Sequence, residues 1–493
     1  MSLSIRQRIT RWAYTWHRKL IWVAAFALFC WTVSGITHPL MAWFGPQAST
    51  FFPPSLTLTT DQIVQFQQRL NTLDLSQARI IKLTPSPHGA AVQVTTGQHR
   101  PRHYYPLQAQ SVNAEYNDRQ HAIWLAHYYL TPPGQMVSTQ QPSVRTVEFI
   151  DAFNQEYPSV NRLLPVYKIS FTTEDNLSVY VHTETNALAS MNNDTKRILQ
   201  TVFQNLHTWR WLDFTGLGRV LIVGLLIMTL FTAALSGLLL VINLRNRPLP
   251  PAKRWHRRLG YILWLPLLAW SASGFYHLLQ AEYIEPVSGM RLGDRLAIQQ
   301  NINSNDFRLP ALLNQQAVNA VSLIQHNSEL FYRVSYSVPV SKVTREQRFQ
   351  GRPAEKQAVY LTASTGELAA LTDAERVRQL ADNFYQTTTS EPALVTHFSP
   401  NYDFRNKRLP VWAVQVHDNQ HRLAFIDPAT GILVDQSRRV DRAERLTFSL
   451  AHKWNFLVPL IDRFPRDVII VMILSLLIVT GVLGVRLQRN KRT

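Results

Sequence analysis

Six of the 16 histidines recur at matched positions in the two halves of the chain. They form three pairs: His17 with His256, His38 with His277, and His207 with His452. Imidazole is a common ligand of haem iron, and ligands in a helical bundle project inward from facing helices. A haem with two axial histidines needs two helices at matched depth. The three pairs are therefore candidate axial ligands of haem.

These histidines belong to a longer internal duplication. Trp16-His17-Arg18 recurs as Trp255-His256-Arg257, and residues 31–38 (WTVSGITH) recur as residues 270–277 (WSASGFYH). Two further matches are Pro165-Val166-Tyr167 with Pro410-Val411-Trp412, and residues 203–212 with residues 448–457. Such parallel repeats insert in the same orientation and are related by a pseudo-twofold axis along the membrane normal. We therefore expect matched histidines at equal depth.

Four apolar stretches have the length of about 20 residues that is needed to cross a bilayer. The fold class predicted is an integral membrane protein with four transmembrane helices, built from a tandem duplication of the unit transmembrane helix, outer α+β domain, transmembrane helix. The only cysteine, Cys30, lies in the first stretch, which excludes an intramolecular disulfide and a cysteine-held iron–sulfur cluster. The expected segments are an N-terminus (1–19), a helix (20–43), an outer domain (44–216), a helix (217–242), an inner loop (243–258), a helix (259–279), a second outer domain (280–467), a helix (468–485) and a tail (486–493).

Positive charge is concentrated at the ends of these helices. Residues 1–20, 243–258 and 486–493 contain no Asp or Glu and carry most of the formal net charge of +18. Lys and Arg next to membrane spans are retained in the cytoplasm. We therefore expect both termini and the middle loop to be cytoplasmic, and both long segments to face outward. The basic pI of about 10.1 then reflects topology, and no nucleic-acid partner is expected.

The long segments combine helical and strand patterns. Residues 61–74 have helical spacing of apolar residues and precede a strand-like run at 78–83. Short strands are expected at 177–181, 359–361 and 422–426. The last of these strands leads into a turn, Asp427-Pro428-Ala429-Thr430-Gly431.

Helical geometry allows two ways of pairing the histidines. The separation of His17 and His38 corresponds to about 31 Å of rise on one continuous helix, so they are expected near one face at opposite membrane surfaces. The same holds for His256 and His277. Two pairings stay open: across the pseudo-twofold axis (His38 with His277, His17 with His256), or within a half (His38 with His207, His277 with His452).

Each histidine also has a simpler interpretation. His17 and His256 fit polar anchors at the membrane interface, whereas an ionisable residue near the end of an apolar span is a functional candidate. The other ten, such as His103, His121 and His417, are expected to be solvated. Zinc is less favoured because no carboxylate or cysteine is repeated beside the six histidines. A small residue precedes Gly in each span, which allows either helix packing or contact with a flat macrocycle: Ser34-Gly35, Ser236-Gly237, Ser273-Gly274 and Thr480-Gly481.

The chain resembles the PepSY-associated transmembrane helix family of bacterial inner-membrane proteins. The resemblance rests on the two Trp-His-Arg motifs, on Leu206-His207 and Ala451-His452, and on residues 425–433 (FIDPATGIL). It implies a location in the bacterial cytoplasmic (inner) membrane, with periplasmic PepSY-like domains. It also implies a haem-b-containing reductase of ferric siderophores. The first half departs from the PepSY pattern at residues 182–186 (HTETN).

The predicted function is transmembrane electron transfer through haem b, with two haems as the natural number. Electrons would pass from quinol or reduced flavin to a ferric siderophore or another ferric chelate in the periplasm, and membrane lipid is the remaining expected partner. The activity would then be that of a haem-dependent ferric-chelate reductase. The alternative is a non-enzymatic binding or regulatory protein whose spans only anchor PepSY-like domains. A transporter is less favoured because the spans contain few charged residues to line a pathway.

Overall fold

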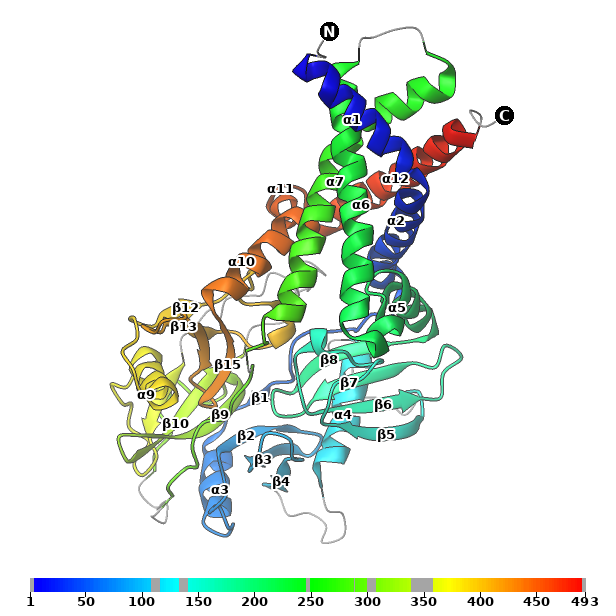
Figure 1. The fold of residues 1–493 in the computed structure, drawn as a ribbon. Coiled ribbons are helices and arrows are strands. Elements are labelled where there is room, and N and C mark those ends of the chain that lie inside the picture. Colours follow the sequence, from blue (N-terminus) through cyan, green and yellow to red (C-terminus); the bar gives the residue numbers. More distant parts are fainter. Residues whose placement is uncertain are drawn as a thin grey trace. The chain divides into compact units, whose positions relative to one another are not determined.

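The computed structural model describes residues 4–107, 116–132, 141–244, 249–287, 289–298, 307–337 and 358–489. The chain divides into two compact units (Figure 1). We call residues 1–45, 195–286 and 441–493 the membrane unit, and residues 46–194 and 287–440 the sheet unit. Four of the basic residues that favour a cytoplasmic location lie outside the described residues: Arg245, Arg247, Lys491 and Arg492.

The membrane unit contains four helices that are long and apolar enough to cross a membrane. They are α2 (Ile21–Phe44), α6 (Leu217–Asn243), α7 (Pro251–Tyr283) and α12 (Arg463–Arg489). Large apolar side chains such as Phe29 and Leu225 remain exposed on these helices, as suits contact with lipid. The predicted integral membrane protein with four apolar helices is confirmed.

The chain bends before the first of these helices. Helix α1 (Ile5–Lys19) ends at Leu20, where φ is −85° and ψ is −6°, and α2 begins at the next residue. A ψ near zero departs from the helical value and redirects the chain. The prediction that His17 and His38 share one continuous helix is therefore wrong. In the second half, His256 and His277 do lie on a single helix, α7.

Shorter helices complete the membrane unit. Two of them, α5 (Asp194–Leu206) and α10 (Arg439–Thr447), lead directly to the segments that contain His207 and His452. After each histidine, a tryptophan with positive φ redirects the chain: Trp209 at 56° and Trp454 at 53°. The remaining elements are a 3₁₀ turn at Arg210–Thr215, a π-helical turn at Phe448–His452, a 3₁₀ turn at Asn455–Leu457 and α11 (Val458–Ile461).

The sheet unit is built around one sheet that contains strands from both long segments. Its antiparallel order is β11-β10-β9-β2-β3-β4, with β1 paired to β9. The central pair is β2 with β9, where Lys82 is opposite Ser322. The two segments expected as separate outer domains therefore share this sheet. Its strands are β1 (Leu56–Thr57), β2 (Ile80–Ser86), β3 (Gly89–Thr95), β4 (His103–Pro106), β9 (Ala317–His326), β10 (Glu329–Tyr336) and β11 (Val359–Thr362).

Each segment also forms a four-stranded antiparallel sheet with a helix packed on it. Helix α4 (Asp118–Leu130) contacts the first, and α9 (Asp373–Tyr385) the second. The strands of the first are β5 (Val144–Ile150), β6 (Val166–Phe171), β7 (Ser178–His182) and β8 (Ala187–Asn192). Those of the second are β12 (Ala393–Val395), β13 (Val411–Gln415), β14 (Leu423–Asp427) and β15 (Ile432–Ser437). A further helix, α3 (Thr60–Leu70), packs its apolar face into the core of the shared sheet.

One buried network of charges links all three sheets. The carboxylate of Glu184, between β7 and β8, accepts hydrogen bonds from Lys82 on β2 and from Arg408, which precedes β13. Arg408 also donates to Asp427 at the end of β14, over 2.9 Å. Burial alone would raise the pKa of Glu184, but the charges of Arg408 and Lys82 outweigh it and hold that pKa below its ordinary value. Removing one member would leave a buried charge without its partner.

Candidate functional site

Four of the six histidines belong to one continuous array of rings in the membrane unit. His207 and His452 form its centre, with ring centroids 6.1 Å apart and planes at 88°. Phe203 stacks on His207 at 4.5 Å and also contacts His38 at 5.9 Å. In the same way, Phe448 contacts both His452 and His277, each at 4.5 Å. The array therefore has matching arms on either side of the central pair.

The central pair is held by matching contacts from α2 and α7. Trp31 Nε1 donates to the carbonyl of His207 at 3.0 Å, and Trp270 Nε1 donates to the carbonyl of His452 at 2.9 Å. Ser34 Oγ lies 3.1 Å from His207 Nδ1, and Ser273 Oγ lies 3.1 Å from His452 Nδ1. Both serines are buried.

The serine contacts fix the tautomer of both rings. Ser34 donates its only hydroxyl proton to the carbonyl of Cys30 at 2.6 Å, and Ser273 donates to that of Ala269 at 2.6 Å. Each hydroxyl oxygen must then accept from the imidazole, so Nδ1 carries the proton. In a neutral ring the lone pair is on Nε2, the arrangement found in metal-bound histidines.

His17 and His256 form a second facing pair. Their ring centroids are 6.1 Å apart, with an interplanar angle of 61°. His17 Nδ1 lies 3.1 Å from the carbonyl of Ala233 on α6, and His256 Nδ1 lies 3.2 Å from that of Thr480 on α12. A carbonyl can only accept, so these rings also carry the proton on Nδ1 and the lone pair on Nε2.

Glycines give the second pair room on both sides. A Cβ at Gly237 would lie 3.4 Å from Cε1 of His17, and a Cβ at Gly484 would lie 3.4 Å from Cε1 of His256. Gly35 and Gly481 have a different neighbour, because a Cβ there would meet Leu474 and Leu28 of the facing helix. The small residues of the spans thus serve helix packing at some positions and imidazole contact at others.

His207 with His452, and His17 with His256, are the residues that would hold a haem iron. No hydrogen bond is made by Nε2 of these four rings within the described chain. The donor set therefore suits haem, whose iron accepts two histidine ligands.

His38 and His277 are placed differently from the other four. Both side chains are exposed, and the phenyl ring of Phe203 or Phe448 contacts each of them as well as the neighbouring histidine. His277 Nδ1 pairs with Glu444 Oε1 at 2.5 Å, whereas the equivalent position in the first half is Leu199. Glu444 was not identified from the sequence, since it has no repeated counterpart.

Other histidines divide between the surface and the core of the sheet unit. His103 and His417 are exposed as expected, but the prediction that His121 is solvated is wrong. His121 is fully buried, stacks on Tyr104 at 4.3 Å and bonds Asn186 through Nε2 at 2.7 Å. Burial lowers its pKa to about 3. Among the described residues, no three His, Cys, Asp or Glu side chains are grouped to hold a metal ion.

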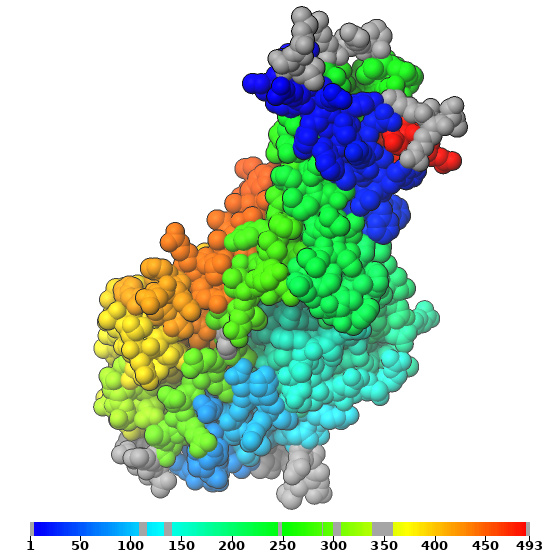
Figure 2. Space-filling view, viewed as in Figure 1, coloured from blue at the N-terminus to red at the C-terminus, as the bar shows by residue number. Residues whose placement is uncertain are grey.

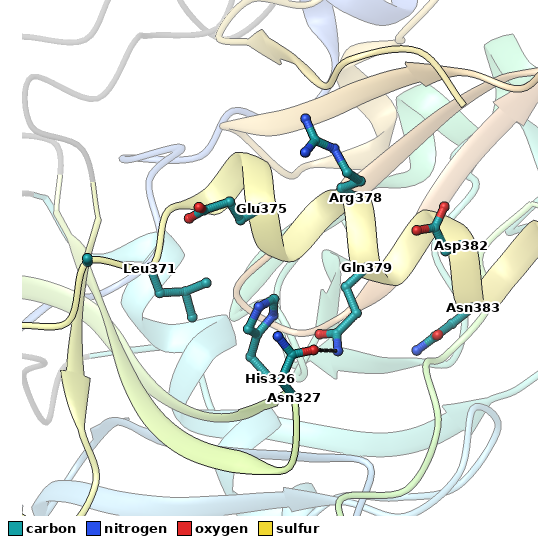
Figure 3. A pocket seen from close by; sticks show the side chains of 9 residues that line it. His326, Asn327, Leu371, Glu375, Arg378, Gln379, Asp382 and Asn383 are labelled. Carbon is teal, nitrogen blue, oxygen red and sulfur yellow. Dashed lines mark hydrogen bonds between the residues drawn. The ribbon is translucent and has the colours of Figure 1, made fainter. Parts of the chain in front are cut away.

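The sheet unit has an open pocket of about 610 Å³ beside α9 (Figure 3). Its polar side chains are largely engaged with neighbours: Gln379 donates to Asn327 at 3.0 Å, and Arg378 pairs with Glu391. Glu375 accepts from the backbone of Thr372 at the start of α9. None of the six matched histidines lines this pocket.

Four apolar helices joined to a mixed helix and sheet unit define an integral membrane protein with a large extramembrane part. Residues 84–319 match the family described as the PepSY-associated TM region. The match confirms the family that the sequence resembles. It extends from β2 to β9 and includes α6, α7 and the histidines His207, His256 and His277. No curated protein matches the chain.

Proposed function

We propose that this chain is a transmembrane b-type haem electron-transfer protein that reduces ferric chelates. The observation that carries the proposal is the presence of two facing histidine pairs, His207 with His452 and His17 with His256, each with centroids 6.1 Å apart. In all four rings Nδ1 is hydrogen-bonded and Nε2 is left for a metal. Bound haem supplies an iron that accepts and releases one electron at a time.

The protein's own groups orient the imidazoles and keep Nε2 deprotonated. At the pair His207–His452 this is done by Ser34, Ser273 and two tryptophans. At the pair His17–His256 it is done by backbone carbonyls of α6 and α12. A hydrogen bond on Nδ1 raises the basicity of the ligating nitrogen and favours the oxidised metal.

Two haems also suit the length of the membrane helices. His256 and Ser273, which contacts His452, mark two levels of α7 that are separated by about 26 Å of helical rise. A second centre shortens the step that each electron must make between the two membrane surfaces. Of the pairings considered from the sequence, His17 with His256 fits this geometry directly. The pairing within a half fits less well, because Phe203 and Phe448 each contact both histidines of their half.

We infer that the other haem is held by His207 and His452. His38 and His277 stay candidate ligands but are less favoured. Exposure of His38 and His277 leaves them suited to contact with the acceptor or with solvent. The sequence features that indicate a cytoplasmic location for both termini imply that His17 and His256 lie near the inner surface of the bacterial cytoplasmic membrane. The sheet unit is then periplasmic.

We further propose that the chain is a tandem duplication. The tryptophan, serine and phenylalanine contacts of His207 are repeated at His452. The sheet unit shows the same correspondence: Tyr157 donates to the carbonyl of Leu163 at 3.0 Å, and Tyr402 donates to that of Arg408 at 2.9 Å. Repetition of specific contacts, and not only of residue types, supports this origin.

A ferric chelate is the acceptor that the family resemblance favours, with quinol or reduced flavin as donor. Hard oxygen ligands that bind ferric iron tightly bind ferrous iron less well, so reduction releases the metal. If bound, haem would supply one electron to each ferric ion, and the chelator would be left to take up protons.

The test uses the purified protein in proteoliposomes, reduced with a soluble quinol and then mixed with a ferric hydroxamate chelate and a ferrous-specific chromophore. We expect the reduced haem band to decay as one ferrous ion appears per electron. The double variant His207→Ala with His452→Ala is the control and should form ferrous iron no faster than buffer. A haem-loaded protein that does not reoxidise would refute the acceptor. A colourless protein from haem-replete cells would favour the non-enzymatic binding protein.

A further inference from the structure

Helix α1 has a stripe of large apolar side chains that remain exposed. Ile5 is 77% exposed, Ile9 40%, Trp12 42% and Trp16 41%. These residues are spaced by four, three and four positions, which places them along one face of the helix. We call them the apolar stripe. An exposed stripe of this kind marks a surface that meets another apolar phase.

A different face of α1 packs on α6. Ala13 is fully buried, and His17 reaches the carbonyl of Ala233 on α6. Arg6 also donates to the carbonyl of Asn243 at the end of α6, at 3.2 Å. The contacts with α6 therefore fix the rotation of α1 about its own axis and leave the apolar stripe uncovered. Atoms of α1 lie at the surface of the membrane unit in Figure 2 (dark blue).

The charge of α1 suits an anionic surface. The helix contains Arg6, Arg8, Arg11, Arg18 and Lys19 and no Asp or Glu. Lys19 Nζ lies over the ring of Trp16 at 5.7 Å, so a cation borders the stripe directly. Amphipathic helices with Trp and aliphatic residues on one face and Lys or Arg beside it lie in the plane of the membrane interface.

The position of α1 in the chain indicates how deep this helix lies in the membrane. Only Leu20 separates α1 from α2, which is apolar enough to cross the membrane. The end of α1 is therefore at the membrane surface, and the chain bends there rather than continuing straight (Figure 1). In the second half the matching residues belong to one helix, α7, from Pro251 to Tyr283.

We propose that α1 is an interfacial helix that binds a bilayer containing anionic lipid. The apolar stripe enters the boundary between headgroups and acyl chains, and the neighbouring Arg and Lys side chains bind headgroup phosphates. Because α1 also carries His17, lipid binding holds this histidine opposite His256. The proposal does not depend on whether the histidine pairs hold haem.

The test measures the depth of α1 in the full-length protein. In a Cys30→Ser background, a nitroxide is attached to Ile9→Cys in the stripe or, as the matched control, to Tyr14→Cys. Tyr14 projects from the opposite side of α1 by helical periodicity. The protein is placed in nanodiscs of phosphatidylcholine with phosphatidylglycerol, and collisions with oxygen and with a water-soluble nickel complex are compared. We expect a several-fold higher oxygen-to-nickel ratio at position 9 than at position 14.

Three results would overturn the proposal. Equal ratios at both positions would show that α1 does not lie in the interface. Spin–spin broadening between labels at position 9 would assign the stripe to a second copy of the chain. If position 9 has the same depth in nanodiscs of phosphatidylcholine alone, anionic headgroups do not take part in binding. A shallower position 9 in those nanodiscs supports their role.

Discussion

The imidazole rings of His207 and His452 face each other with their centroids 6.1 Å apart, although they come from opposite halves of the chain. Each ring is stacked on a phenylalanine and hydrogen-bonded through Nδ1 to a buried serine. The pair therefore combines one imidazole from each half of the chain. The pair His17–His256 has the same separation and the same tautomer.

Replacing His452 by Ala should remove one of two haems. The facing ring, His207, would keep its contacts but lose the second axial ligand, and a single histidine binds haem less tightly. The haem content of the purified variant, measured as pyridine haemochrome, should fall to about half of the wild-type value.

The matched comparison is His277→Ala, which removes a histidine of the same array that does not face a second imidazole. It should retain the wild-type haem content. Loss of haem in His277→Ala with normal content in His452→Ala would reverse the assignment of ligands.

Replacing both Ser34 and Ser273 by Ala should weaken haem binding without abolishing it. The variant loses the acceptors that fix the Nδ1 protons of His207 and His452, and loss of such outer partners typically lowers metal affinity by about 10- to 100-fold. The midpoint potential of one haem should also change, as followed by a redox titration of its reduced band. Ser475→Ala is the control, since this exposed serine bonds only the carbonyl of Val471. An unchanged potential and affinity would mean that the serines do not orient the ligands.

The sequence was sufficient to predict the four membrane helices. It also marked six histidines as candidate ligands, which stays a prediction. The length of an apolar stretch and the repetition of residues can be read directly from the sequence, because neither depends on tertiary contacts. The facing of His207 and His452 was not predicted, because it depends on where α5 and α10 end and on the turns at Trp209 and Trp454. The bend at Leu20 was not predicted either, because the sequence next to it contains no proline or glycine.

The sheet unit shows the same limit. The short strands expected at 177–181 and 422–426 from apolar residues and adjacent turns correspond to β7 and β14, each displaced by one residue. The pairing of β2 with β9 joins residues from different halves, and no local pattern indicates it. Burial of His121 likewise follows from tertiary contacts with Tyr104 and Asn186.

Glu184→Gln should strongly destabilise the sheet unit. The amide cannot neutralise Lys82 and Arg408, and breaking a buried ion pair by removing one partner costs about 3–5 kcal/mol. Hydrogen exchange of β2 and β14 in the full-length protein should become faster. Glu391→Gln, which removes an exposed partner of Arg378, serves as the control and should leave the exchange unchanged. Equal effects of the two substitutions would contradict a structural role for the network.

Acidification should destabilise the sheet unit through His121. Its pKa is about 3 in the folded protein because the ring is buried, and 6.5 in the unfolded chain. As the pH falls, His121 of the unfolded chain therefore binds a proton at a higher pH than His121 of the folded protein. The folded state keeps its full stability above pH 6.5 and loses stability as the pH falls toward 3. At pH 5 the loss amounts to about 2 kcal/mol. The free energy of unfolding measured in urea should fall less between pH 7 and pH 5 in His121→Phe; an identical fall would exclude His121 as a source.

The most direct test of the central claim is the absorption spectrum of the detergent-purified wild-type protein, oxidised and then reduced with dithionite, with haem quantified as pyridine haemochrome. Two bis-histidine sites predict a sharp reduced α-band and about two haems b per chain. A protein from haem-replete cells with no Soret or α-band would contradict the account and leave the facing histidines with a structural role only.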